Sequence, residues 1–83
     1  MYEVIIESKA AKQIRRFPKE IVKRLEKVLA ALRANPRPHA CEKLTGTDGW
    51  RIRVGDYRIL YAIDDESELV TIYKVSHRRE AYR

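Results

Sequence analysis

Arginines recur in the stretch WRIRVGDYRILY at a spacing typical of β-strands. Side chains alternate between the two faces of a strand, so Arg51 and Arg53 lie together, away from the apolar residues between them. A two-residue turn at Gly55-Asp56 would place Arg53 directly opposite Arg58 in a hairpin. Opposed like charges cost roughly 0.2–1 kcal/mol. The pairing therefore favours a polyanion bound by these arginines, although solvated arginines that fan apart on an open sheet face fit the pattern equally well.

The closing segment SHRREAYR adds a second basic cluster, with His77, Arg78 and Tyr82 among its residues. Arginine suits phosphate because its planar fork donates two parallel hydrogen bonds and keeps its charge. If the segment stays close to the sheet, Arg78 joins the hairpin arginines in gripping an RNA backbone, and Tyr82 or Trp50 can stack on a base. Such a cluster could also stabilise the phosphorane of RNA cleavage, where losing one well-placed donor costs roughly 10²–10³ in rate.

Some of these residues also have a plainer structural interpretation. Trp50, at the start of a strand and on its apolar face, fits a core residue better than a stacking platform. His77 on its own is more often an ordinary surface histidine. Residue types alone therefore indicate a small basic domain that binds RNA or an acidic protein.

The sequence lacks the residue patterns that other classes of reaction require. It contains no glycine-rich phosphate loop, no suggestive pair of carboxylates and no cysteine–histidine arrangement with an orienting partner. His39 and Cys41 lie close together, but two candidate ligands without a second pair indicate structural residues rather than a metal site. We expect neither a metal nor a cofactor.

Size and charge limit the class of protein. The chain has 83 residues and a formal net charge of +6, which suits one domain over residues 1–83 and an anionic partner such as nucleic acid, an acidic protein or a membrane surface. Cys41 is the only cysteine, so an intrachain disulfide is impossible and a reducing compartment is the simpler interpretation. No apolar run approaches the roughly 20 residues of a membrane span, and the N-terminus does not resemble a signal peptide. We expect a cytoplasmic protein with no membrane partner.

The first half of the chain is predicted to form a strand and a helical hairpin. Residues 2–7 are rich in β-branched side chains, and Ser8 can cap a helix that ends at Phe17-Pro18. A second helix over residues 19–34 carries an apolar stripe made of Ile21, Leu25, Val28, Leu29 and Leu32. Basic amphipathic helices can bind membranes or calmodulin, but a core-facing stripe with a solvated basic face is the commoner arrangement.

The second half is predicted to form a three-stranded antiparallel meander. Two prolines end the second helix, and residues 35–49 are expected to be loop or irregular structure. The strands are expected at residues 50–54, 57–63 and 69–75. The apolar face of the meander should pack on the helices and the N-terminal strand should join its edge, so the fold class is α+β.

The stretches NPRP…KLTG…WRIRVGDYRILY and SHRREAYR resemble the RelE/ParE superfamily of bacterial and archaeal type II toxin–antitoxin toxins, with the RelE branch the nearer match. The resemblance runs from Tyr2 to Arg83. It implies a helical hairpin on a curved antiparallel sheet, and a toxin that enters the ribosomal A site and cuts mRNA by attack of a ribose 2′-OH on the adjacent phosphate. It also implies a cognate, RelB-like antitoxin that neutralises the toxin in a hetero-oligomer, with the ribosome and mRNA as further partners.

The resemblance assigns roles residue by residue. Arg58 matches a phosphate-stabilising arginine on the second hairpin strand, and Arg78 matches the arginine after the last strand. Tyr82 is the best candidate for a C-terminal tyrosine, although its spacing is shorter than in some members. Arg51 and Arg53 stand where members often have lysines. Since arginine does not give up its proton, both are expected to bind and stabilise rather than act as a base.

The proton of the 2′-OH must then go elsewhere. His77 is the residue of the tail whose type suits this transfer near neutral pH, and Tyr82 is the alternative. The predicted catalytic set is therefore Arg51, Arg53, Arg58, His77, Arg78 and Tyr82, and the residues expected to bind RNA alongside it are Lys43, Arg79 and Arg83.

Three functions fit these residues. The first is a ribosome-dependent mRNA endoribonuclease that needs no metal. The second is a ParE-like toxin that inhibits DNA gyrase without cleaving nucleic acid, since both branches share one fold. The third is a basic RNA-binding module without toxicity. The arginines on both hairpin strands and the HRREAY ending favour the nuclease.

Overall fold

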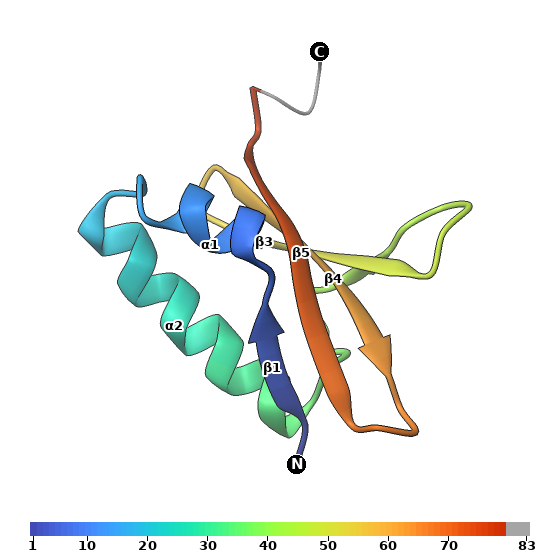
Figure 1. The fold of residues 1–83 in the computed structure, drawn as a ribbon. Coiled ribbons are helices and arrows are strands. Elements are labelled where there is room, and N and C mark those ends of the chain that lie inside the picture. Colours follow the sequence, from blue (N-terminus) through green and yellow to red (C-terminus); the bar gives the residue numbers. More distant parts are fainter. Residues whose placement is uncertain (80–83) are drawn as a thin grey trace.

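A computed structural model describes residues 1–79, in which a five-stranded sheet carries both helices on one face (Figure 1). Its elements in chain order are β1 (Glu3–Ile6), α1 (Ser8–Ile14), α2 (Lys19–Ala34), β2 (Glu42–Lys43), β3 (Gly49–Val54), β4 (Tyr57–Asp64) and β5 (Leu69–His77). The α+β class, the helical hairpin and the C-terminal meander are as predicted. Neither helix in this part of the chain is long and apolar enough to cross a membrane.

The strands are ordered β1-β5-β4-β3-β2. β1 pairs in parallel with β5 at one edge, which confirms the place predicted for the N-terminal strand, and the remaining pairs are antiparallel. β2 lies at the other edge, where Glu42 pairs with Arg51 and Lys43 with Trp50. Both residues of β2 were expected to lie in a loop, and that expectation was wrong. Two residues are too few to establish an alternating pattern.

The β3–β4 hairpin has the predicted register, because Val54 pairs with Tyr57, Arg53 with Arg58 and Ile52 with Ile59. Gly55 has a φ of 60°, in the left-handed region that glycine adopts without strain. A Cβ at this position would also lie 3.1 Å from Cδ1 of Ile21 on α2. The glycine therefore permits both the tight turn and the close approach of the hairpin to the helix.

The helices pack as their apolar spacing predicts, but α1 begins differently. Leu25 and Leu32 of α2 are buried, with the other residues of the predicted stripe packed beside them. Ser8 is the first helical residue rather than the cap, so that assignment was wrong. The N-cap is Glu7, whose extended backbone precedes the helix and whose side chain makes no capping hydrogen bond.

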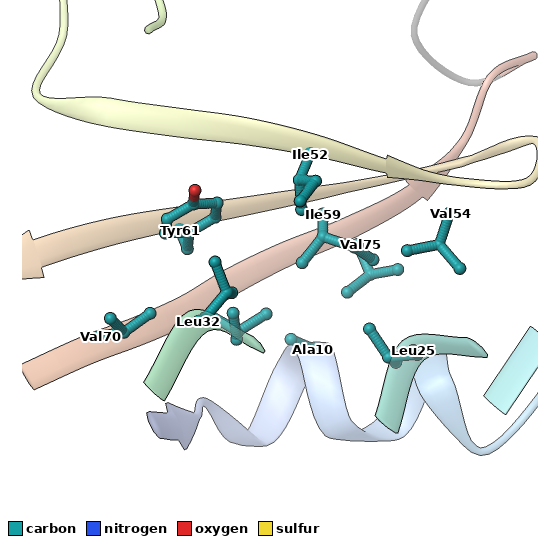
Figure 2. Packing of buried hydrophobic residues seen from close by; sticks show 10 residues of the cluster. Ala10, Leu25, Leu32, Ile52, Val54, Ile59, Tyr61, Val70 and Val75 are labelled. Atoms are coloured by element: carbon teal, nitrogen blue, oxygen red, sulfur yellow. The ribbon is translucent and has the colours of Figure 1, made fainter. Parts of the chain in front are cut away.

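The core fills the space between the helices and the inner face of the sheet (Figure 2). Ile52, Ile59 and Val75 meet there from three neighbouring strands, opposite Ala10 of α1. The buried residues of the core are Ala10, Leu25, Leu32, Ile52, Val54, Ile59, Tyr61, Val70, Ile72 and Val75.

A β-bulge interrupts the pairing of β4 with β5. Leu60 pairs with Lys74, but the next residue, Tyr61, pairs with Ile72, so Tyr73 is an extra residue in β5. Val70 and Ile72 before the bulge and Val75 after it all face the core. The alternation of β5 therefore changes phase at the bulge, and His77 follows Val75 on the helix side while Arg78 follows Ser76 on the outer side.

Tyr61 ties β4 to the segment after α2. Its hydroxyl donates a 2.9 Å hydrogen bond to the buried carbonyl of Pro36, and burial raises the pKa of its phenol. We expect Tyr61→Phe to lower the free energy of unfolding by about 1–3 kcal/mol, because the Pro36 carbonyl would stay buried without its partner. Urea denaturation followed by circular dichroism measures this change.

Tyr2→Phe provides the matched control. The Tyr2 hydroxyl donates to Asp65 at an exposed site, where water replaces a lost partner. If Tyr61→Phe lowered the free energy of unfolding no more than Tyr2→Phe does, the role assigned to the Pro36 hydrogen bond would be contradicted.

Candidate nucleic-acid interface

Three of the predicted arginines line one hollow at the end of the sheet. This arginine hollow has a volume of about 110 Å³, and its walls are Arg53, Gly55, Asp56, Tyr57, Arg58 and Arg78. The N–H of Arg78 donates a 2.8 Å hydrogen bond to the carbonyl of Asp56, which fixes the end of β5 to the hairpin turn. Figure 1 shows this turn and the end of β5 at the same end of the molecule. The hairpin and the segment after β5 are thus brought together as the sequence predicts.

Arg51 lies on the same face but outside the arginine hollow. Its guanidinium forms an ion pair with the carboxylate of Glu42 on β2. The pKa of Glu42 lies below its usual range, chiefly because of this hydrogen bond and the charge of Arg51, with smaller contributions from the charges of Arg53 and Arg58. Glu42, which was not among the predicted site residues, is therefore an ionised competitor for any phosphate that approaches this face.

Removing that competitor should strengthen RNA binding. We expect Glu42→Gln to bind single-stranded RNA about three- to tenfold more tightly at low salt. The logarithm of its affinity should also fall more steeply with the logarithm of the salt concentration, by the amount that about one more phosphate contact gives. Fluorescence polarisation of a labelled RNA over a range of KCl concentrations measures both quantities. Glu66→Gln makes the same change of charge in the exposed turn between β4 and β5. Equal affinities for the two variants would argue against competition at Arg51.

His77 lies in a second hollow on the other side of β5. This aromatic hollow has a volume of about 360 Å³, and its walls are Gln13, Arg16, Phe17, Tyr57, Val75, Ser76 and His77. The Tyr57 and Phe17 ring centroids are 4.0 Å apart, and the His77 ring meets that of Tyr57 edge-on at 5.1 Å. His77 was expected in the tail beside Arg78, but it ends β5, and the bulge turns it away from the arginine hollow. Its predicted role as a base stays a prediction.

The remaining predicted residues lie apart from both hollows or outside the described residues. Lys43 donates a 2.8 Å hydrogen bond to the carbonyl of Thr47, and its ammonium lies 5.4 Å from the centroid of the Trp50 ring. Trp50 packs against the core, as its structural interpretation predicts. Arg79 is exposed. Tyr82 and Arg83 lie beyond the residues that the structure describes.

The aromatic hollow contains residues that sequence reasoning missed. Phe17 was assigned to a helix break and Tyr57 to a strand, yet among residues 1–79 Tyr57 alone belongs to the walls of both hollows. Gln13 accepts a 3.2 Å hydrogen bond from the N–H of Val75 through its Oε1 atom. A polar residue near the end of a short helix is too common a feature to have indicated this contact.

Comparisons with known proteins agree with this geometry. Residues 4–82 match the family described as the ParE toxin of the type II toxin–antitoxin system parDE. A toxin RelE of Mycobacterium tuberculosis is 34% identical over 84 residues, which cover 99% of this chain and 87% of that protein.

Solved structures are similar as well. The archaeal RelE–RelB complex from Pyrococcus horikoshii has a chain that superposes with a TM-score of 0.86 at 30% identity, covering 93% of this chain and 94% of that one. The intact RelBE complex of E. coli gives a TM-score of 0.82 at 28% identity, with 93% and 96% covered. The chain therefore belongs to the RelE/ParE superfamily of type II toxins and lies on its RelE side.

Proposed function

We propose that this toxin inhibits translation by cutting mRNA in the ribosomal A site. The observation that carries the proposal is the convergence of Arg53, Arg58 and Arg78 on one hollow. Three permanently charged guanidinium groups around a small cavity form a binding site for a phosphate group. They can also stabilise the extra negative charge that the phosphate acquires during cleavage.

The reaction is an internal transesterification. The ribose 2′-oxygen forms a bond to phosphorus while the bond from phosphorus to the 5′-oxygen of the next nucleotide breaks. The 2′-OH loses its proton and the leaving 5′-oxygen gains one. The arginines supply electrostatic stabilisation of the phosphorane, and Arg51 is available to a neighbouring phosphate once Glu42 is displaced.

His77 and Tyr82 are the proposed candidates for the proton transfer. In the described structure Nδ1 of His77 accepts a 3.2 Å hydrogen bond from the N–H of Arg79, so Nε2 carries the proton of the neutral ring. His77 is then a donor, and it can act as a base only after this hydrogen bond is lost. Cleavage by a His77→Ala variant at the full rate, beside loss of cleavage in Arg78→Ala, would assign the catalysis to the arginines.

We also propose a cognate antitoxin as the partner of this chain in a hetero-oligomer. The relatives from P. horikoshii and E. coli were solved as RelE–RelB and RelBE complexes. The net charge of +6 suits an antitoxin segment that is acidic and competes with RNA for the arginines.

Programmed ribosomes provide the deciding experiment. The toxin is mixed with ribosomes that hold a defined codon in the A site, and the mRNA ends are mapped by primer extension. We expect new ends within the A-site codon, and none when the same mRNA is offered without ribosomes.

A supercoiling assay with DNA gyrase runs beside it, because the matching family is described as that of ParE. Gyrase inhibition without new mRNA ends would replace the proposed function with the gyrase-directed one. If neither new mRNA ends nor gyrase inhibition appeared, the remaining function would be that of a basic RNA-binding module.

A further inference from the structure

The face of the sheet turned away from the helices carries a half-buried aromatic side chain, that of Tyr73. Both helices lie on the opposite face (Figure 1), so no helix within residues 1–79 covers this outer face. On β5 the bulge leaves Tyr73 and Lys74 between the buried Ile72 and Val75. Since Ile72 and Val75 both face the core, Tyr73 and Lys74 both lie on the outer face.

Gly49 explains how the Tyr73 ring lies. A Cβ at Gly49 would be 2.4 Å from the Tyr73 hydroxyl. Gly49 belongs to β3, and β4 lies between β3 and β5, so the phenol of Tyr73 reaches across a whole strand. The missing side chain at Gly49 therefore lets the ring lie across the outer face. Aromatic rings placed on the open face of a sheet are the platforms on which some RNA-binding domains stack unpaired bases.

Two cations share one row of the outer face. Arg51 pairs with Leu60, and Leu60 pairs with Lys74. Neighbouring strands lie about 4.8 Å apart, so roughly 10 Å separate the backbones of Arg51 and Lys74, and both side chains are long enough to meet one phosphate above Leu60. Arg51 forms its ion pair with Glu42, whereas no salt bridge within residues 1–79 involves Lys74.

This row continues the arginine hollow. Arg53 and Arg58 pair in the next row, two residues along each strand and about 6.7 Å away. Successive phosphates of an extended single strand have a similar spacing. A strand whose phosphate lies in the arginine hollow can therefore place a neighbouring phosphate between Arg51 and Lys74, with a base over Tyr73.

We propose that Tyr73, Lys74 and Arg51 form a second nucleotide subsite on the outer face of the sheet. The Tyr73 ring stacks on a base of single-stranded RNA, and it accepts any base because every base has a flat π-face. Lys74 and Arg51 bind the adjoining phosphate. The subsite holds a nucleotide outside the cleaved bond, and the statement that this RNA is mRNA rests on the proposed function.

Oligonucleotide binding separates the stacked base from the bound phosphate. The full chain is titrated with two labelled hexamers, and fluorescence polarisation follows the binding. One is 2′-O-methyl hexa-adenylate, which lacks the attacking hydroxyl, and the other is an abasic sugar–phosphate strand with the same number of phosphates. We expect hexa-adenylate to bind at least about fivefold more tightly, the low end of the effect of one stacked base.

Tyr73→Leu tests the stacking platform. Leucine keeps an apolar side chain but removes the ring, so the preference for hexa-adenylate over the abasic strand should fall at least about fivefold. Tyr73→Phe keeps the ring and should keep the preference. A general loss of folded protein weakens both strands alike, so the ratio reports the stacked base. An unchanged ratio in Tyr73→Leu would overturn the subsite.

Lys74→Gln and Lys27→Gln form a matched pair that tests the phosphate contact. Both lysines are exposed, but Lys27 lies on α2, on the other side of the sheet. Lys74→Gln should weaken binding of both hexamers, and the slope of log affinity against log salt concentration should become shallower by about 0.7, the value for one phosphate of a single strand. Lys27→Gln should keep the wild-type slope. Equal slopes in the two variants would remove Lys74 from the subsite.

An acidic peptide is the other ligand that these cations attract. A labelled decamer of glutamate is therefore titrated beside the hexamers, and Tyr73→Leu should leave its affinity unchanged. A loss as large as that for hexa-adenylate would assign the outer face to an acidic protein segment and overturn the RNA subsite. Failure of the ribosome assay, with the hexamer results intact, would overturn the proposed function and leave the subsite standing.

Discussion

Replacement of Arg58 by alanine should slow mRNA cleavage by roughly 10²–10³-fold, the usual cost of one well-placed donor to a developing oxyanion. Arg58 is half-buried on β4, directly opposite Arg53, and it lines the arginine hollow together with Arg78. Its position is held by pairing on both sides, with β3 and with β5. The pairing fixes the backbone from which the Arg58 guanidinium reaches the hollow, so the fold provides part of the positioning that catalysis needs.

Single-turnover cleavage on programmed ribosomes measures the effect. Arg58→Lys keeps the charge but loses the planar fork, so its rate should lie between those of the wild type and Arg58→Ala. Arg33→Ala removes an exposed arginine from the last turn of α2 and should cleave at the wild-type rate. A full rate for Arg58→Ala in a protein that remains folded would remove Arg58 from the proposed catalytic set.

Replacement of Ile59 by alanine should lower the free energy of unfolding by about 2–5 kcal/mol, and Ile59→Val by about 0.5–1.5 kcal/mol. Ile59 is fully buried and pairs with Ile52 on one side and with Val75 on the other. Alanine at this position leaves a cavity between the sheet and α1. Ala10, which lies opposite on α1, is too small to fill that cavity. Urea denaturation of the two variants gives both values.

The Ile59 series also separates stability from chemistry. Its side chain faces the core, whereas the neighbouring Arg58 faces the other side of the sheet. Cleavage per folded molecule should therefore stay near the wild-type rate for Ile59→Val. A loss of cleavage in Ile59→Val as large as that in Arg58→Ala would show that core packing, rather than the arginine, limits the reaction.

Alternation and turn chemistry were sufficient to predict the hairpin. The pairing of Arg53 with Arg58 follows from the apolar residues on either side and from Gly55, whose positive φ suits a two-residue turn. The stripe of α2 follows in the same way from its three- and four-residue spacing. These features depend on contacts close in sequence, where local patterns carry the information.

Other features depend on contacts between distant parts of the chain and could not be predicted. β2 forms only because Arg51 and Trp50 of β3 give Glu42 and Lys43 an edge to pair with. The bulge at Tyr73 depends on how β5 meets β4 and α1, and it was missed together with the side of the strand on which His77 lies. Arg78 was correctly expected near the hairpin, because it follows a strand that ends beside the turn.

The extra residue in β5 affects the arginine hollow through the bulge that it forms, which decides the side of the strand that each following residue faces, rather than through its own side chain. The same residues paired in regular alternation, with Tyr73 in the ladder instead of in a bulge, would exchange the two sides of the strand's end. His77 would then lie among the arginines, and Arg78 would lie against Phe17 and Tyr57. Relatives with a strand of the same length but without the bulge can therefore carry the same closing residues and present opposite chemistry to a bound RNA. An alignment of closing motifs therefore compares equivalent positions only where the preceding strands share the bulge.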